Sequence, residues 1–449
     1  MMASKKKLTL LLVLIAVAFG LVNVFLIPPF MNPDEIQHFM FTANYAYNSK
    51  QLEKLDAELL QLLKDYKWFH FIGVGPGWEK ITRIKDIYFL NYFVREKYSV
   101  SKTYFHFLYG HALKLSGIKT PIRAFYFLRF LSLLFYLAIF LCCLWFYQTY
   151  FPDFWIFMAS GQLLLFQPTT ILTSVNYDVL LVLLGVLFFI LAYRFLATES
   201  EDWVDLTLLV VVSALAAVIK KGGLLFFLYL FLLLLFKSRS IWRLLKRIVL
   251  TMLITVVVFS WFNYLLPGRF FALYTSIFSK YRGVFHIPIE TNNSLFEPGF
   301  FTSVWNSFYF YTGWMGFKLD SWWYIALNAF FFLAIVGAIG LLLIKKCGAS
   351  HLEKKWHLYI MGVIGLQLLS IWLYYGSGLT AQGRYLYPLL LPIITLLFGG
   401  LHAIEKYFDW RKHYLLYSLL VLDSFFLVAA LVRIISVFYL EIASPHPGL

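Results

Sequence analysis

Long apolar segments alternate with short polar connections along most of the chain. The first segment, residues 8–27, holds twenty apolar-rich residues, enough for a helix to cross about 30 Å of hydrocarbon. Further candidate spans are bounded by Pro, Gly or charge at about 122–148, 154–173, 179–197, 204–220, 223–236, 246–266, 323–344, 357–375, 387–403 and 414–440. The pattern predicts an all-α polytopic membrane protein with about eleven transmembrane helices in a single integral membrane domain, 1–449.

The start of the chain has two interpretations. Lys5, Lys6 and Lys7 precede the first apolar segment, as basic residues also do in a secretory signal peptide. The apolar run is longer than a usual signal core, and no small-residue cleavage pattern follows it. We therefore interpret the segment as an uncleaved span with its N-terminus in the cytoplasm.

Two long connections are predicted on the extracytoplasmic side, at 28–120 and 267–322. Within the first, leucines and a tyrosine recur at helical spacing between charged residues: Leu52, Leu55, Leu59, Leu62, Leu63 and Tyr66. This pattern is typical of an amphipathic helix lying in the membrane interface, or of a surface helix packed on the rest of the protein. A second helix is predicted over Tyr104–Leu115.

Composition supports the membrane class. Hydrophobic residues make up 61% of the 449 residues and charged residues 14%, against about 45–50% and about 25% in soluble domains. The net charge of +15 lies largely in loops that alternation places inside, such as 237–247, 345–355 and 406–412, so it follows the positive-inside rule and requires no nucleic acid. The acidic loop 199–205 is an exception. The three cysteines form no disulfide framework or CxxC metal motif.

Two adjacent carboxylates follow the first span, in the motif Asn32-Pro33-Asp34-Glu35-Ile36-Gln37-His38. In one interpretation the motif only starts a helix, with Asn32 as N-cap and Glu35 completing a capping box. In the other, Asp34 or Glu35 is a catalytic carboxylate, and His38 lies on the same helical face as both. The two roles are compatible. We favour Asp34 as the base, because the capping box would occupy Glu35.

Three more motifs fall on the same predicted side. Asp178 opens an apolar span and shares with Asn176 the alternative of a helix cap. Lys220 and Lys221 interrupt two apolar runs, where they bind an anion or extend to the lipid headgroups. Arg384 precedes a late span and suits bidentate phosphate binding, with a headgroup anchor as the alternative.

In this order, the motifs resemble those of a family of bacterial multispan membrane proteins in the GT-C class of membrane glycosyltransferases. The matching residues are Pro33-Asp34-Glu35-Ile36-Gln37-His38, Asn176-Tyr177-Asp178, Lys220 and Gln382-Gly383-Arg384-Tyr385-Leu386-Tyr387-Pro388. The resemblance implies a GT-C-like fold in the bacterial cytoplasmic membrane, a polyprenyl-phosphate sugar as donor, and an active site at the acidic motif on the non-cytoplasmic face. One departure is Lys102-Thr103-Tyr104-Phe105-His106, where related proteins often carry a Pro-Pro-Tyr-type motif.

The chemistry expected of these residues is coherent, because transfer from a lipid phosphate to a hydroxyl needs a base and cations for the leaving phosphate. The candidate catalytic residues are Asp34, Glu35 and Asp178. The candidate phosphate-binding residues are Lys220, Lys221 and Arg384. The supporting residues are His38, Asn176, Gln382 and Tyr385.

These residues by themselves identify no cofactor, and a divalent metal that bridges carboxylates and phosphate through oxygen ligands is compatible with them. The expected partners are the polyprenyl-phosphate sugar, membrane lipids, and a glycan, lipid or protein acceptor, with no nucleic acid. A polysaccharide polymerase or ligase is a chemically close alternative. A lipid-linked sugar flippase or transporter is the other, although such proteins usually place ionisable groups near the membrane midplane.

Overall fold

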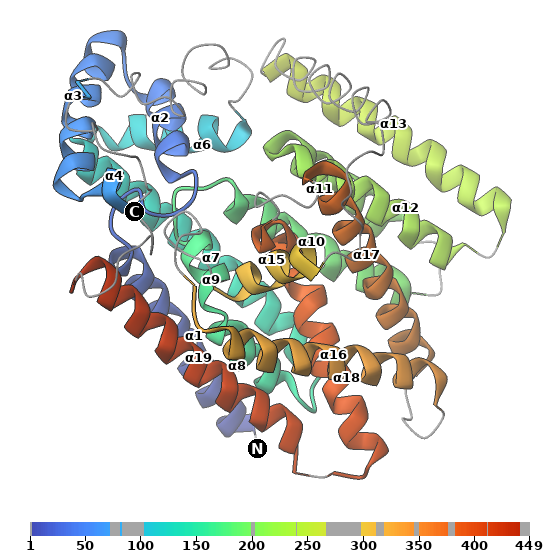
Figure 1. The fold of residues 1–449 in the computed structure, drawn as a ribbon. Coiled ribbons are helices and arrows are strands. Elements are labelled where there is room, and N and C mark those ends of the chain that lie inside the picture. Colours follow the sequence, from blue (N-terminus) through green and yellow to red (C-terminus); the bar gives the residue numbers. More distant parts are fainter. Residues whose placement is uncertain are drawn as a thin grey trace.

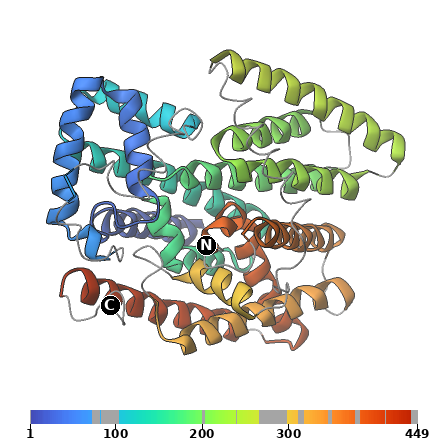
Figure 2. The same cartoon turned by 45° about the horizontal axis from the view of Figure 1, so that its top comes forward.

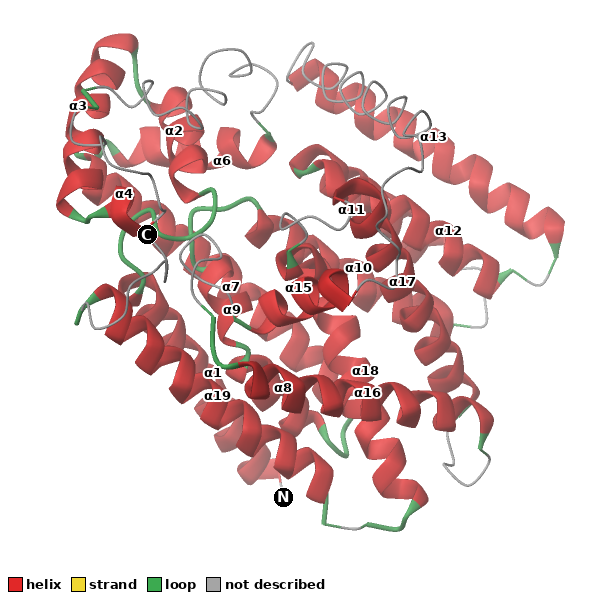
Figure 3. Ribbon diagram, in the orientation of Figure 1, coloured by secondary structure: helices red, strands yellow, loops and turns green. Residues whose placement is uncertain are grey.

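The structure is a computed structural model. It describes residues 2–71, 81–82, 103–198, 203–238, 240–265, 298–310, 318–344, 350–375, 382–410 and 412–440. Within these ranges every regular element is a helix and there is no strand (Figure 3). The prediction of an all-α protein is confirmed.

Eight helices in these ranges are long and apolar enough to cross a membrane. They are α1 (Met2–Leu26), α7 (Pro121–Tyr150), α10 (Asp178–Ala197), α13 (Ile241–Leu265), α16 (Ser321–Leu343), α17 (His351–Tyr375), α18 (Leu390–Tyr407), which continues the 3₁₀ turn η5 (Gly383–Leu389), and α19 (Tyr414–Phe438). The chain is therefore a polytopic membrane protein, and each of these helices coincides with a predicted span.

The remaining predicted spans form shorter helices. These are α8 (Trp155–Leu164) with α9 (Phe166–Leu172), then α11 (Trp203–Ile219), and then α12 (Leu225–Lys237) after the 3₁₀ turn η3 (Lys221–Leu224). The break between α8 and α9 has a local cause in Pro168. Proline has no N–H to donate to the carbonyl of Leu164, and its ring would clash with that carbonyl in a continuous helix. A short helix, α15 (Pro298–Tyr309), precedes α16.

Four helices of the predicted 28–120 loop gather on one side of the molecule (Figures 1 and 2), and in Figure 1 they lie at the end remote from the N-terminus. They are α2 (Glu35–Ala46), α3 (Ser49–Asp65), α4 (Trp68–Phe71) and α6 (Tyr104–Ser116). Both helices predicted in this loop are confirmed. In α3, Asn48 and Gln51 form a reciprocal capping box at 3.0 Å each, which explains where the helix begins. Most of the predicted 267–322 loop lies outside the described residues, as do 345–349 and 441–449.

Helix α18 occupies the centre of the bundle. In the most apolar 18 residues of η5 and α18, 89% of the residues are buried. In the most apolar 18 residues of α13, at the edge of the bundle, only 6% are buried. Small residues allow α16 to approach α18 closely: a Cβ on Gly400 would lie 2.0 Å from the Ala334 carbonyl oxygen, and one on Gly337 would lie 1.9 Å from that of Gly400. This packing gives η5, at the start of α18, a rigid support.

Candidate functional site

The acidic motif lies between α1 and α2, and the start of α2 is not capped as predicted. Helix α2 begins at Glu35, its N-cap is Asp34, and no side chain makes a capping hydrogen bond there. The prediction of an N-cap at Asn32 with a capping box to Glu35 is therefore wrong. Asp34 adopts the left-handed conformation (φ 62°), which aspartate tolerates better than most residues.

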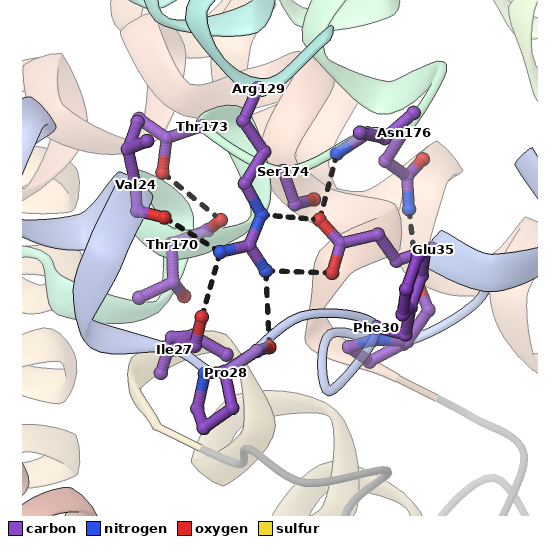
Figure 4. A network of polar contacts seen from close by, with 12 residues as sticks. Val24, Ile27, Pro28, Phe30, Glu35, Arg129, Thr170, Thr173, Ser174 and Asn176 are labelled. Carbon is purple, nitrogen blue, oxygen red and sulfur yellow. Dashed lines mark hydrogen bonds and ion pairs between the residues drawn. The ribbon is translucent and has the colours of Figure 1, made fainter. Parts of the chain in front are cut away.

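Glu35 is instead half of a buried ion pair with Arg129 of α7 (Figure 4). The guanidinium donates from Nε to Oε1 and from Nη2 to Oε2, both at 2.8 Å, and the two side chains are 1% and 0% exposed. Arg129 also donates to carbonyls at the end of α1, and Glu35 accepts from the backbone ahead of α10. These further partners are Val24, Ile27, Pro28 and Val175. Glu35 thus joins three segments and accepts three hydrogen bonds while fully buried, which gives it a structural task.

Asp34 has a different partner. Its Oδ2 forms an ion pair with Nη2 of Arg384 in η5 at 2.6 Å, although the two residues are 350 positions apart in the sequence. The Asp34 side chain remains 27% exposed and that of Arg384 11%. Asp34 is therefore an accessible carboxylate, in contrast to its neighbour Glu35.

A second carboxylate–cation pair lies beside the first. Lys220, at the end of α11, donates to Asp178 Oδ1 at 2.5 Å, and the two side chains are 14% and 2% exposed. Asn176 accepts from the Asp178 backbone N–H (3.0 Å) and donates to the Pro33 carbonyl (3.3 Å). The N-cap of α10 is Tyr177, which makes no side-chain capping hydrogen bond. Asn176, one residue earlier, binds the first N–H of the helix, while the Asp178 side chain faces the lysine.

Two tyrosines connect the pairs. The Lys220 ammonium lies 4.5 Å from the ring centroid of Tyr177 and 5.2 Å from that of Tyr385, and the Arg384 guanidinium lies 5.4 Å from the Tyr385 ring. Close backbone packing brings these segments together. A Cβ added to Gly185 of α10 would lie 2.3 Å from the Pro388 carbonyl oxygen of η5, so glycine is needed for the two backbones to approach this closely. We call Asp34, His38, Tyr177, Asp178, Lys220, Arg384 and Tyr385 the polar cluster.

His38 enters the polar cluster with a defined tautomer. The Thr103 backbone N–H donates to His106 Nδ1 (3.0 Å), so neutral His106 carries its proton on Nε2 and donates it to His38 Nδ1 (2.9 Å). The proton of neutral His38 is then on Nε2. That nitrogen is buried, lies in a ring 4.3 Å from Tyr177, and has no hydrogen-bond partner among the described residues. His38 is thus prepared to donate to a ligand.

Electrostatics in the polar cluster follow from burial and charge. Burial, reinforced by the positive charges of Arg384 and Lys220, holds the pKa of His38 well below its usual value. Burial raises the pKa of Tyr177 to about 12. For Lys220, burial is the largest influence and lowers the pKa, but the Asp178 carboxylate together with Tyr177 and Tyr385 outweighs it, so the net pKa is raised and the ammonium stays charged.

Unpartnered polar atoms concentrate here. Within the described part of the chain, Nε and Nη1 of Arg384, Oδ2 of Asp178, Nε2 of His38 and the Tyr387 hydroxyl are buried without a hydrogen-bond partner. Buried polar groups are nearly always paired in folded proteins, so such a concentration indicates a ligand. Three N–H groups of Arg384 and the His38 Nε2–H are donors, which suits an anion with several oxygens.

Two other predicted residues, Lys221 and Gln382, lie within two positions of members of the polar cluster in the sequence. Lys221 is exposed at the start of η3, and Gln382 is the residue before η5. Sequence reasoning missed Arg129 and the link from His38 to His106. Arg129 left one signal, a charge inside an apolar span, because an intramembrane charge requires a partner.

The lowered pKa of His38 gives the stability a testable pH dependence. Because the folded protein keeps His38 neutral, acidification below about pH 6.5 protonates this residue in the unfolded chain only. The free energy of unfolding should then fall by up to about 1.4 kcal/mol per pH unit from this residue. Unfolding measured from pH 7.5 down to 5 should show a shallower decline in His38→Asn, and a wild-type decline in the exposed control His111→Asn. Equal slopes in all three proteins would contradict this assignment.

Comparison with protein-family models, with curated proteins and with solved structures gives no significant match to this chain. The residues of the polar cluster and their geometry are therefore the basis on which a function is inferred.

Proposed function

We propose that the protein is a membrane glycosyltransferase that moves a sugar from a polyprenyl-phosphate donor to an acceptor hydroxyl on the non-cytoplasmic face. One observation carries the proposal. Two carboxylate–cation pairs, Asp34–Arg384 and Asp178–Lys220, come from four separate segments and meet around shared tyrosines, with unpartnered donors beside them. Carboxylates and cations in one place supply the two needs of the reaction, a proton acceptor and a countercharge for phosphate.

The same pairs favour eleven crossings of the bacterial cytoplasmic membrane, with a GT-C-like arrangement and the N-terminus inside. Residues that meet at one membrane face must be separated by an even number of crossings. Between Asp34 and Asp178 only α7 is long enough by itself, so α8 and α9 together must return the chain. Between Asp178 and Lys220, α11 must cross after α10. Between Lys220 and Arg384 the long helices α13, α16 and α17 make three crossings, so α12 must supply the fourth. The short helices are therefore counted as spans in this proposal, and the polar cluster is placed outside.

In the proposed reaction the acceptor hydroxyl oxygen attacks the anomeric carbon while the bond from that carbon to the phosphate oxygen breaks. Asp34 accepts the hydroxyl proton. The bonding electrons leave with the polyprenyl phosphate, whose added negative charge is stabilised by Arg384 and Lys220. The His38 Nε2–H donates to a phosphate oxygen. Both carboxylates are already engaged by cationic side chains, which favours these cations, rather than a metal bridging the carboxylates, as carriers of the phosphate charge.

Asp34 is preferred to Asp178 as the base because it is the more exposed carboxylate, at 27% against 2%. Donor phosphate that takes over Arg384 would release the Asp34 carboxylate toward the acceptor. Asp178 then holds Lys220 in position. Glu35 supports the site through Arg129, and Asn176 fixes the turn from which Asp178 projects.

Release of polyprenyl phosphate tests the proposal. Purified protein is incubated with radiolabelled polyprenyl-phosphate sugars and a native membrane extract as the acceptor source, and released lipid phosphate and labelled product are counted. We expect Lys220→Ala to lower donor use by roughly tenfold to a hundredfold, since a charge-assisted contact contributes about 1.5–3 kcal/mol. The exposed Lys119→Ala serves as the charge-matched control and should retain wild-type turnover.

Other outcomes would reassign the activity. Preference for a lipid-linked oligosaccharide over a monosaccharide donor would indicate a polymerase or ligase. Movement of the intact lipid across a vesicle membrane, without cleavage of either donor, would indicate a flippase and overturn the transferase proposal.

A further inference from the structure

A second group of chemically versatile side chains lies at the opposite end of α18. His402 and Glu405 are one helical turn apart near the end of α18, and His413 is the residue before α19. Eighteen residues of η5 and α18 separate Arg384 from His402, on the order of 27 Å at helical rise. In Figure 1 the connection from α18 to α19 lies at the same end of the bundle as the N-terminus, away from α2 and α6.

The three side chains converge on one point. Glu405 Oε2 lies 3.0 Å from His413 Nδ1 and 3.8 Å from His402 Nδ1, and one ligand atom from each residue falls within 4.8 Å of the others. Two ligands of a tetrahedral zinc ion, each about 2.0–2.2 Å from the metal, lie about 3.4 Å from one another. The two separations from Glu405 bracket that value, and the two histidine nitrogens, which lie within 4.8 Å of one another, would approach by up to about 1.4 Å when an ion binds.

The two oxygens of Glu405 have separate tasks. Oε1 accepts from the backbone N–H groups of Leu415 (2.7 Å) and Leu416 (3.2 Å), which caps the first turn of α19. Helix capping therefore explains Oε1 and leaves Oε2 facing the histidines. His413 is held toward Oε2 by its left-handed backbone (φ 51°).

His402 is the side chain that capping leaves unexplained. Its Nδ1 is buried, points toward Glu405 Oε2 from beyond hydrogen-bond distance, and has no hydrogen-bond partner in the described ranges. The ring is stacked on Phe154 with centroids 4.7 Å apart, so its orientation is fixed by packing. An orphaned imidazole nitrogen aimed at a carboxylate, with a second imidazole opposite, is the donor set that zinc prefers.

We propose that His402, Glu405 and His413 bind a divalent zinc-type ion that ties the end of α18 to the start of α19. Two imidazole nitrogens and one carboxylate oxygen make three protein ligands, and water completes the tetrahedron, since both histidines are partly exposed. The site is separate from the polar cluster and does not depend on the proposed transferase activity.

Zinc titration of the whole protein tests this proposal. Untagged protein in detergent is stripped with a chelator and titrated with zinc by calorimetry, and the bound metal is counted by mass spectrometry. We expect one ion per chain in the wild type and loss of stoichiometric binding at micromolar zinc in His402→Ala and His413→Ala. The exposed histidine at the start of α17 gives the matched control, His351→Ala, which should bind as the wild type does.

Thermal unfolding supplies a second readout. Zinc should raise the melting temperature of the wild type and of His351→Ala, because a ligand that binds only the folded state stabilises it, and should leave that of His402→Ala unchanged. His402→Ala keeps the Glu405 cap, so it is expected to fold. Absence of stoichiometric zinc in the wild type, or undiminished binding in His402→Ala, would overturn the site and leave Glu405 as a helix cap.

Discussion

Replacement of Asp34 by Asn is expected to slow single-turnover sugar transfer by about a hundredfold to ten-thousandfold, the usual contribution of a general base. Asparagine tolerates the left-handed backbone that this position requires, and its side-chain oxygen can occupy the place of the Asp34 oxygen beside Arg384. The variant should therefore fold and bind donor while lacking a proton acceptor. Rapid-quench measurement of a single turnover at saturating donor isolates this step.

Two further variants make the assignment falsifiable. Asp153→Asn removes an exposed carboxylate from the turn between α7 and α8, and it should leave the rate unchanged. Asp178→Asn removes the more buried carboxylate of the polar cluster. A fast Asp34→Asn together with a slow, well-folded Asp178→Asn would move the base to Asp178. Rapid transfer by both would remove the carboxylates from the chemistry.

Loss of the Arg129 guanidinium is expected to produce the largest fall in stability, about 3–5 kcal/mol. Arg129→Met would leave the Glu35 carboxylate buried without its countercharge, and would strip hydrogen bonds from three backbone carbonyls at the end of α1. Removing one partner of a buried pair is costly because the remaining charge has lost its water as well as its partner. Denaturant unfolding in detergent, compared at one pH and one lipid content, measures the difference.

An exposed ion pair within the same chain provides the control. Lys54 and Glu58 on α3 lie 3.6 Å apart with side chains 80% and 39% exposed. Lys54→Met should cost about 0–1 kcal/mol, because solvent screens the pair. Glu35→Gln should be strongly destabilising as well, since it would leave the buried Arg129 guanidinium without its countercharge. Equal, small effects of Arg129→Met and Lys54→Met would show that the buried network does not hold α1, α2 and α7 together.

Local sequence pattern predicted the positions of most helices of the bundle. Hydropathy and boundary residues located the helices of all the predicted spans, and leucine spacing located α3, because an amphipathic or membrane-length helix is encoded in consecutive residues. The pattern did not divide 154–173 into α8 and α9, although Pro168 carried the signal. Length and composition do not decide whether short helices such as α11 and α12 cross the membrane. That depends on how these helices pack in the bundle.

The candidate site divides in the same way. By itself, the sequence determined which residues were chemically notable: Asp34, Asp178, Lys220 and Arg384 were all singled out by charge at span ends. Only the tertiary structure decided their partners, since the pair Asp34–Arg384 joins residues 350 positions apart and Glu35–Arg129 joins two that are 94 apart. Local reasoning gave Glu35 a capping box, whereas burial against α7 offered its carboxylate a bidentate guanidinium. The physical reason is that capping depends on neighbours in the chain, while an ion pair between helices depends on packing that no short stretch of sequence encodes.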